Sequence, residues 1–253
     1  MRNVQTEPRH GVQAIARAAA ILRALETAPA GLSLGEIAAA TELPKSTVHR
    51  IAGALAEEDL LVQWGDGRIG LGSAVARLAA AGREALSERL RPLLAELRRQ
   101  LDETVDLAVL DGKAVRFVDQ VPAPRRLRTV SAVGESFPLH CTANGKALLA
   151  TMSTERVESL LPPRLPRLTP RTLASRAELL RELEAVRHDG VAFDREEHTE
   201  GICAIGAAVH DPAGPAAAIS VPVPTQRFAG RESELSEAVR ATAAAATVLL
   251  SGE

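Results

Sequence analysis

Residues that could act as nucleophiles or metal ligands stand together at two places in the second half of the sequence. His140 precedes Cys141, and His198 follows Glu196 and Glu197. A cysteine nucleophile needs a histidine within hydrogen-bonding distance, whereas neighbouring residues of a strand point to opposite faces. A catalytic zinc ion needs ligands at a defined spacing, which Glu196, Glu197 and His198 do not supply. We therefore expect no catalytic residue, no metal site and no cofactor, with Cys141 as a small buried residue.

The stretch 44–57 predicts a helix with one apolar and one polar side. Val48, Ile51, Ala52 and Leu55 share one side at helical spacing, and Pro44 suits the first position of a helix. The other side presents Lys45, Ser46, Thr47, His49, Arg50 and Gly53. Arginine can pair with guanine edges, while lysine and hydroxyl groups can hold phosphates. We therefore expect a recognition helix whose polar side chains contact the major groove of double-stranded DNA.

Two helices are expected to precede this one and to support it. The first begins near Val12 and ends before Pro29 and Gly31. Its expected apolar side consists of Val12, Ile15, Ala19, Leu22 and Leu25. Ser33 and Glu36 then form a capping box, in which each side chain satisfies a backbone N–H of the helix start. A short second helix is therefore predicted to follow Ser33.

A hairpin is expected after the recognition helix. Two short apolar runs flank Gly65–Gly67, and such a turn sequence is typical of a two-stranded wing. Arg68 lies near the tip, where it is expected to touch a phosphate or the minor groove. Residues 1–72 hold seven Lys or Arg against eight Asp or Glu, so this region is not basic. Since phosphate neutralisation supplies much of the affinity for DNA, we expect a dimer, which doubles the contacts.

The composition is that of an ordinary globular protein, with 46% hydrophobic and 25% charged residues and a net charge of -2. The two cysteines are too few for a disulfide framework and are compatible with a reducing cytosol. The chain contains no apolar run of the roughly 18 residues that a membrane-spanning helix needs, and its start lacks the apolar core of a signal peptide. We therefore expect a cytoplasmic protein with no membrane partner. With four Phe, one Trp and no Tyr, any ligand cavity is expected to have a mainly aliphatic lining.

The remaining chain predicts a linker helix followed by a mixed domain. A helix from Ser73 to about Ala81 is expected to break at Gly82, and a leucine-striped helix is expected over 86–101. Strands are expected over 104–111, 114–121, 127–133, 191–194, 204–210 and 216–221, and helices over 144–151, 154–161, 175–190 and 233–250. This order indicates an α+β fold. The expected division is a DNA-binding domain (1–72), a linker helix (73–84) and a second domain (85–253).

Four segments resemble the IclR family of bacterial transcription regulators. LSLGEIAAATELPKSTVHRIAGALAEEDLLVQWGDGRIGLG is similar to the winged helix-turn-helix of that family. FPLHCTANGKALLA, FDREEHTEGICAIGAAVHD and AAAISVPVPTQRF resemble its C-terminal effector-binding domain, a GAF-like fold with a central antiparallel sheet. The resemblance implies a homodimer or homotetramer that binds operator DNA and changes its affinity when a small molecule binds. A hydrolase-type enzyme for small molecules, with an N-terminal interaction module, is the alternative.

The resemblance also implies where an effector binds. Ala143 and Asn144 open a helix whose unpaired N–H groups could hold a carboxylate, and Asp194, Ser220 and the region of Cys203 match ligand-contacting positions of the family. The cysteine is displaced by one position relative to the family pattern, so either Cys203 or Ala204 faces the ligand.

Four further expectations concern the second domain. Pro222 replaces a serine, which favours a less polar pocket and an aliphatic or aromatic effector over a very small carboxylic acid. Asp194 could equally be a strand-end residue. Lys146 is expected to be a surface charge, and Glu196–His198 is expected to be a solvated loop paired with Arg195 or Arg227.

Overall fold

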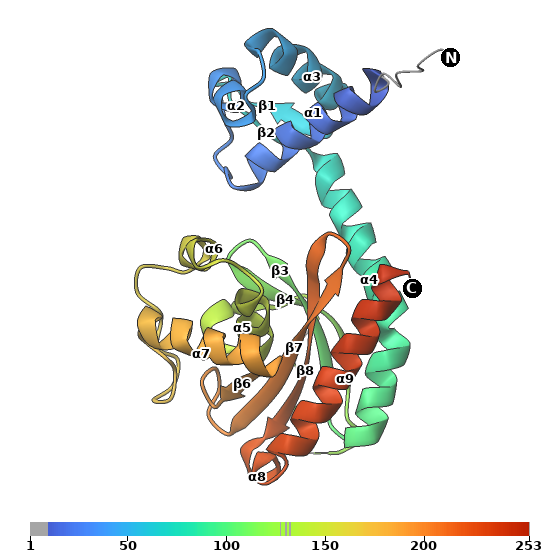
Figure 1. Ribbon diagram of the computed structural model, residues 1–253, viewed down its shortest axis with the longest axis vertical. Helices are drawn as coiled ribbons and strands as arrows, with labels where there is room; N and C mark the ends of the chain where they lie inside the picture. The colour runs from blue at the N-terminus through green and yellow to red at the C-terminus, as the bar shows by residue number, and fades with distance from the viewer. Residues whose placement is uncertain (1–9, 127, 130, 132, 253) are drawn as a thin grey trace, which may run out of the picture. The chain divides into compact units, whose positions relative to one another are not determined.

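The computed structural model describes residues 10–126, 128, 129, 131 and 133–252 (Figure 1). These residues form two compact units, and the boundary between them lies after Arg83. Among the described residues, no helix is both long and apolar enough to cross a membrane.

The first unit packs three helices against a two-stranded hairpin. Its elements are α1 (His10–Glu26), α2 (Leu34–Thr41), α3 (Lys45–Glu57), β1 (Leu61–Gln63) and β2 (Ile69–Leu71). The capping box at the start of α2 is present as predicted: Ser33 Oγ accepts the N–H of Glu36, whose carboxylate accepts the N–H of Ser33. The strands pair antiparallel around the predicted turn. The structure therefore confirms the predicted arrangement of helices and wing.

The apolar side predicted for α1 is confirmed at Leu22 and Leu25 but is wrong at Ile15. Ile15 is 72% exposed, whereas Ile21 and Leu25 are buried and Ala18 and Leu22 pack beside them. Because α1 is rich in alanine, its spacing alone does not fix which residues of its first turns face the core. Contact with α2 and α3 selects the stripe through Ile21.

The predicted break at Gly82 is also wrong, because α4 is one helix over Ser73–Leu101. A glycine inside a helix costs only about 1 kcal/mol relative to alanine. The good helix formers around Gly82 compensate for that cost. The predicted linker 73–84 is thus the first part of a longer helix, and the domain boundaries at 72 and 84 stay predictions.

The second unit is built on a six-stranded antiparallel sheet with the strand order β5-β4-β3-β8-β7-β6. Its strands are β3 (Val105–Asp111), β4 (Ala114–Val121), β5 (Ser136–Pro138), β6 (Ala192–Arg195), β7 (Ile202–Asp211) and β8 (Gly214–Pro224). Its shorter and longer helices are η1 (Leu139–Cys141), α5 (Ala143–Ala150), α6 (Thr154–Leu160), α7 (Arg176–Asp189), α8 (Thr225–Phe228) and α9 (Glu232–Ser251). The expected strands and helices are therefore present within a few residues, except for the strand over 127–133.

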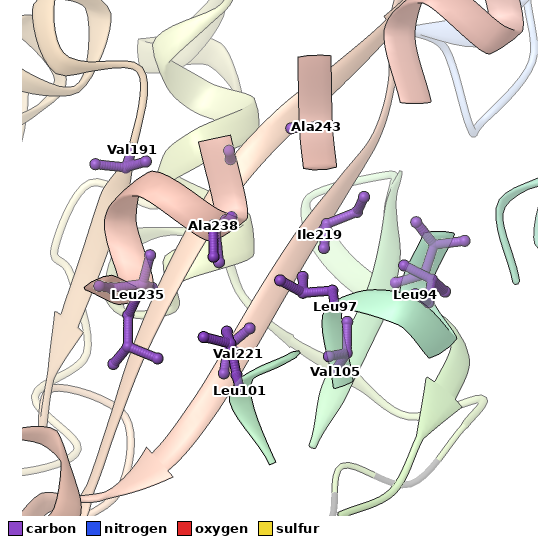
Figure 2. Packing of buried hydrophobic residues seen from close by; sticks show 14 of the residues in the cluster. Leu94, Leu97, Leu101, Val105, Val191, Ile219, Val221, Leu235, Ala238 and Ala243 are labelled. Atoms are coloured by element: carbon purple, nitrogen blue, oxygen red, sulfur yellow. The ribbon is translucent and has the colours of Figure 1, made fainter. Parts of the chain in front are cut away.

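Helices cover both faces of this sheet. On one face, leucines of α4 and apolar residues of α9 pack on β3, β7 and β8; Figure 2 shows Leu94, Leu97 and Leu101 beside Ile219 and Val221. On the other face, α5, α6 and α7 pack on Ala108, Ala192 and Ala218 among others. Residues therefore alternate along each strand between a leucine-rich core and a layer that carries small and polar side chains.

The strand predicted over 127–133 is not formed by its described residues, which are 128, 129, 131 and 133. Leu127, Val130 and Ala132 lie outside the described residues. Thr129 is instead held by side-chain bonds, because its carbonyl accepts from Thr104 Oγ1 at 2.9 Å and its own hydroxyl donates to Pro222 O at 2.8 Å. These bonds replace a strand ladder and fix Thr129 beside β8.

Candidate functional site

Helix α3 exposes a polar surface that its core side holds in place. Val48, Ile51, Ala52 and Leu55 are buried against α1 and α2. The polar residues are exposed apart from Thr47, which is half-buried: Lys45, Ser46, Thr47, His49 and Arg50. Among the described residues, none forms a hydrogen bond or ion pair with the side chain of Lys45 or Arg50. The predicted face of α3 is therefore free to meet another molecule.

Arg68 was predicted to touch a phosphate or the minor groove, but its guanidinium is bound within the first unit. Its Nη2 donates to Gly31 O at 2.9 Å and its Nε donates to Ala30 O at 3.1 Å. Nη2 also lies 3.4 Å from the Glu36 carboxylate. Arg68 thus ties the hairpin to the turn before α2, and we withdraw it as a primary contact with DNA.

Replacing Arg68 by alanine is expected to lower the stability of the first unit by about 1–2 kcal/mol, since the carbonyl oxygens of Ala30 and Gly31 lose a charged, half-buried donor. Trp64, the only tryptophan of the chain, lies in the hairpin between Gly31 and Gly70, so its fluorescence follows this unit in a urea titration. Arg77→Ala is the control, because that side chain is 65% exposed and 3.9 Å from its nearest carboxylate. An unchanged midpoint for Arg68→Ala would show that the guanidinium is a free surface group.

A cavity of about 120 Å³ lies in the second unit, on the face of the sheet that α5 covers. Its described lining consists of Asp106, Phe117, Thr129, Ser131, Phe137, Thr142, Ala143, Asn144, Asp194, His198, Thr199, Ile202, Ala204, Ser220 and Pro222. Strand pairing explains the floor: Asp106 stands opposite Ser220, and Asp194 stands opposite Ala204, which in turn faces Pro222. The cavity therefore brings together Ala143, Asn144, Asp194, Ala204 and Ser220 of the predicted effector site.

Gly206 of β7 allows the start of α5 to lie directly on the sheet. A Cβ atom there would stand 3.0 Å from the carbonyl carbon of Ala143 and 3.2 Å from its Cβ. Thr142 caps α5 by accepting the N–H of Gly145. Ala143 and Asn144 are thereby placed at the cavity wall.

Cys203 is excluded from the cavity by the register of β7. It belongs to the core under α9, and its Sγ lies 3.6 Å from Thr225 Oγ1. Ala204, the next residue, faces the cavity because neighbouring residues of a strand point to opposite faces. Of the two alternatives left by the sequence, the structure selects Ala204 and corrects Cys203.

Two buried carboxyl groups belong to the cavity lining. Asp106 accepts from Gln120 Nε2 and Ser131 Oγ, both at 2.7 Å, and burial raises its pKa to about 7. Asp194 accepts the N–H of Glu197 at 2.7 Å, and burial likewise raises its pKa to about 7. Both groups therefore exchange protons near neutral pH.

Three aromatic rings form one wall, contrary to the expected aliphatic lining. Phe137 stacks on His198 with 4.3 Å between ring centroids and meets Phe117 edge-on at 5.0 Å. Burial lowers the pKa of His198, which keeps the imidazole neutral. Two of the chain's four phenylalanines are thus placed at this cavity.

Lys146 is fully buried, although a surface charge was predicted. Its Nζ donates to Glu197 Oε1 at 2.6 Å and also to Glu182. Glu197 is therefore buried as well, while Glu196 pairs with Arg171 at 2.8 Å. The prediction of a solvated loop paired with Arg195 or Arg227 is wrong, because Lys146 draws this loop onto α5.

The candidate nucleophile lacks activation. Cys141 is fully buried, and burial raises the pKa of its thiol to about 12. His140 Nε2 is engaged with Pro166 O at 2.9 Å. This pair therefore offers no thiolate, as expected for a small buried cysteine.

Two family models match the sequence over these two units. The IclR helix-turn-helix domain matches residues 14–65, and the bacterial transcriptional regulator IclR C-terminal domain matches residues 78–248. The chain belongs to the IclR family.

Individual IclR-family proteins are similar over most of the chain. The HTH-type transcriptional regulator Rv1719 of Mycobacterium tuberculosis is 52% identical over 232 residues, which cover 91% of this chain and 90% of that protein. TtgV of Pseudomonas putida, an HTH-type transcriptional regulator, is 42% identical over 76% of this chain and 74% of its own length. The crystal structure of the Thermotoga maritima IclR has a TM-score of 0.64 at 25% identity and covers 95% of this chain and 98% of that one. The chain is thus a transcriptional regulator with a C-terminal effector-binding domain.

Several cavity residues of this IclR-family chain were missed by the sequence analysis. Asp106 had a usable signal, because it is a carboxyl inside the apolar run TVDLAVL. Phe117 and Phe137 had none, since their meeting depends on the pairing of β4 with β5. Ser131 and Thr129 were missed because residues 127–133 were predicted to form a strand.

Proposed function

We propose that the exposed polar face of α3 reads an operator, that the cavity beneath α5 holds the effector, and that the chain acts in the cytoplasm as a homodimer or homotetramer. The observation that carries the DNA contact is the separation of α3 into a buried apolar side and a polar side without partners among the described residues. Lys45, Ser46 and Thr47 lie in its first turn, which is the part of a recognition helix that meets base edges and phosphates. Arg50 follows one turn later on the same face.

Dimerisation is supported by the charge of residues 1–72, where acidic residues outnumber basic ones by one. A single copy would release few counterions from DNA, so two copies on two half-sites account better for tight binding. Effector control requires two arrangements of the protein that bind the effector with different affinities. The continuous helix α4 is the proposed coupling element, because it begins directly after the hairpin and its leucines belong to the core of the sheet domain.

Replacing Arg50 by alanine is expected to weaken operator binding roughly 10- to 100-fold, since one arginine paired with a guanine contributes about 1–3 kcal/mol. The operator is first selected from genomic fragments with the wild-type protein, and affinity is then measured by gel shift. Lys113→Ala is the matched control, because it removes an exposed positive charge from the β3–β4 turn and is expected to bind within about twofold of wild type.

Two results would contradict the proposal. One is an Arg50→Ala variant that binds the selected fragment as tightly as Lys113→Ala does. The other is wild-type protein that retains no genomic fragment even at low salt, where phosphate contacts are strongest.

A further inference from the structure

The cavity is acidic, whereas the sequence analysis expected a site that could hold a carboxylate. Asp106 and Asp194 belong to its described lining, which includes no lysine or arginine. The nearest buried cation, Lys146, is committed to Glu182 and Glu197. A ligand that enters the cavity therefore meets carboxyl groups without a cation facing it from the described lining.

The two acids stand at opposite sides of the floor. Asp106 is on β3 and Asp194 is on β6, and β8 and β7 lie between them. With about 4.8 Å between neighbouring strands, the backbones of β3 and β6 are roughly 14 Å apart. Ser220, Ala204 and Pro222 fill the space between with short side chains. The two carboxyl groups therefore make both sides of the floor acidic.

Among the described residues, two acceptors of the cavity lining have no hydrogen-bond partner. Asn144 Oδ1 is buried and has no hydrogen-bond partner among the described residues. Asp194 Oδ1 accepts the N–H groups of Glu197 and His198. Asp194 Oδ2 accepts no hydrogen bond from the described residues. Asp194 Oδ2 thus remains for a ligand that donates a hydrogen bond.

The aromatic wall and the size of the cavity limit the rest of the ligand. Phe117, Phe137 and His198 present ring surface, and the face of an aromatic ring attracts cations. The volume of about 120 Å³ is similar to that of engineered cavities of about 150 Å³ that accept benzene. One ring with a short polar substituent fits this space.

We propose that the effector is a compact, ring-containing amine or alcohol that carries no negative charge and donates a hydrogen bond to Asp194. This inference rests on the proposed function of the cavity as the effector site. A carboxylate would bring a third acidic group against two buried ones and would leave Asp194 Oδ2 unpaired. An amine or hydroxyl satisfies that oxygen, and a protonated amine adds attraction to the carboxylates and to the rings.

Matched ligands that differ only in the polar group test this proposal. Benzylamine, benzyl alcohol and benzoate form one set, and cyclohexylmethylamine, cyclohexylmethanol and cyclohexanecarboxylate form a second. Binding to the full chain without DNA is measured by calorimetry near pH 8. In at least one set the amine or the alcohol is expected to bind, with an affinity at least about tenfold above that of its carboxylate partner.

Two variants locate the binding. Asp194→Asn keeps the acceptor for the Glu197 N–H but removes the charge, and it is expected to weaken amine binding about tenfold. Asp106→Asn provides the same test if the first variant folds poorly by circular dichroism. Asp189→Asn, which removes an exposed carboxyl at the end of α7, is the control and is expected to bind as wild type does.

The proposal is overturned if a carboxylate binds more tightly than its amine and alcohol partners, if no member of either set binds at millimolar concentration, or if both cavity variants bind amines as wild type does. The failure of the proposed function is a separate result, because it is the loss of operator binding in a gel shift performed without any ligand.

Discussion

Replacing Lys146 by methionine is expected to lower the free energy of unfolding of the C-terminal domain by about 3–5 kcal/mol, which is the usual cost of removing one partner from a buried ion pair. Lys146 is fully buried, and its Nζ is the partner of Glu197 Oε1 at 2.6 Å. Glu197 Oε2 already has no hydrogen-bond partner among the described residues. Without the lysine, a buried carboxylate would lose its compensating charge.

Methionine is the appropriate replacement because it keeps the length of the side chain and avoids a large hole. Urea unfolding followed by far-UV circular dichroism reports the effect on the domain. Fluorescence of Trp64 reports on the helix-turn-helix in the same samples, and its midpoint is expected to stay unchanged. Lys113→Met controls for the loss of a positive charge at an exposed position.

A second substitution separates the loss of charge pairing from the loss of packing. Burial raises the pKa of Glu197, which shows that its charge is unfavourable there without a cation. In the Lys146→Met variant that cation is missing, and a glutamine at position 197 removes the unbalanced charge. Lys146→Met combined with Glu197→Gln is expected to recover about half of the lost stability. A single variant that unfolds at the wild-type urea concentration, or a double variant that is less stable than the single one, would contradict this role.

The same ion pair positions the cavity beneath α5. Lys146 belongs to α5, whose first residues form one wall, and Glu197 lies between Asp194 and His198, which belong to the cavity lining. By joining α5 to this loop, the pair fixes two sides of the cavity relative to each other. Lys146→Met is therefore also expected to weaken effector binding at urea-free conditions, although Lys146 contacts no cavity atom.

Local patterns were sufficient to predict most elements and the exposed polar side of α3. Val48 and Ile51 mark its buried side because helical spacing depends only on nearby residues. The hydrogen bonds of Arg68 could not be predicted, since its partners Ala30 and Gly31 lie more than thirty residues earlier in the sequence. Arginine in a hairpin gives no sign of which carbonyl oxygens the fold will bring to it.

Strand alternation predicted that only one of Cys203 and Ala204 could face a ligand, and the register of β7 decided which. The burial of Lys146 had no local signal, because Glu182 and Glu197 come from α7 and from the loop after β6. The acidity of the cavity likewise depends on the position of β3 in the sheet, which places Asp106 opposite Ser220. Long-range pairing, which periodicity does not encode, therefore determines the chemistry of the cavity.

The stability of the C-terminal domain is expected to fall between about pH 4 and pH 7 through Asp106, and Asp106→Asn is expected to remove this part of the decline. The carboxyl has a pKa of about 7 in the folded protein against a usual value of 3.8, and burial is the main cause. Below pH 4 it is protonated in both states. Between the two values the unfolded chain ionises while the folded protein keeps the proton, so unfolding becomes easier as pH rises. Above pH 7 the penalty is complete and constant.

The size of the effect follows from the shift, since one pKa unit corresponds to about 1.4 kcal/mol and the shift of Asp106 sets an upper limit of about 4 kcal/mol. Asparagine can still accept from Gln120 and bond to Ser131, so the variant changes mainly the charge. The quantity to measure is the difference in unfolding free energy between Asp106→Asn and wild type, by urea unfolding across pH 4 to 8. Asp194 and His198 titrate in both proteins, so their contributions cancel in this difference.

The difference is expected to grow in favour of Asp106→Asn up to about pH 7 and then to level off. Asp189→Asn removes a surface carboxyl of the same domain and serves as the control. A difference that is equal at pH 4.5 and pH 7.5 would mean that Asp106 is ionised throughout this range. In that case an amine ligand would meet an ionised Asp106 at every pH in this range. The expected growth means instead that Asp106 releases its proton near neutral pH, and a cationic effector held beside this carboxyl is then expected to bind more tightly as pH rises toward 8.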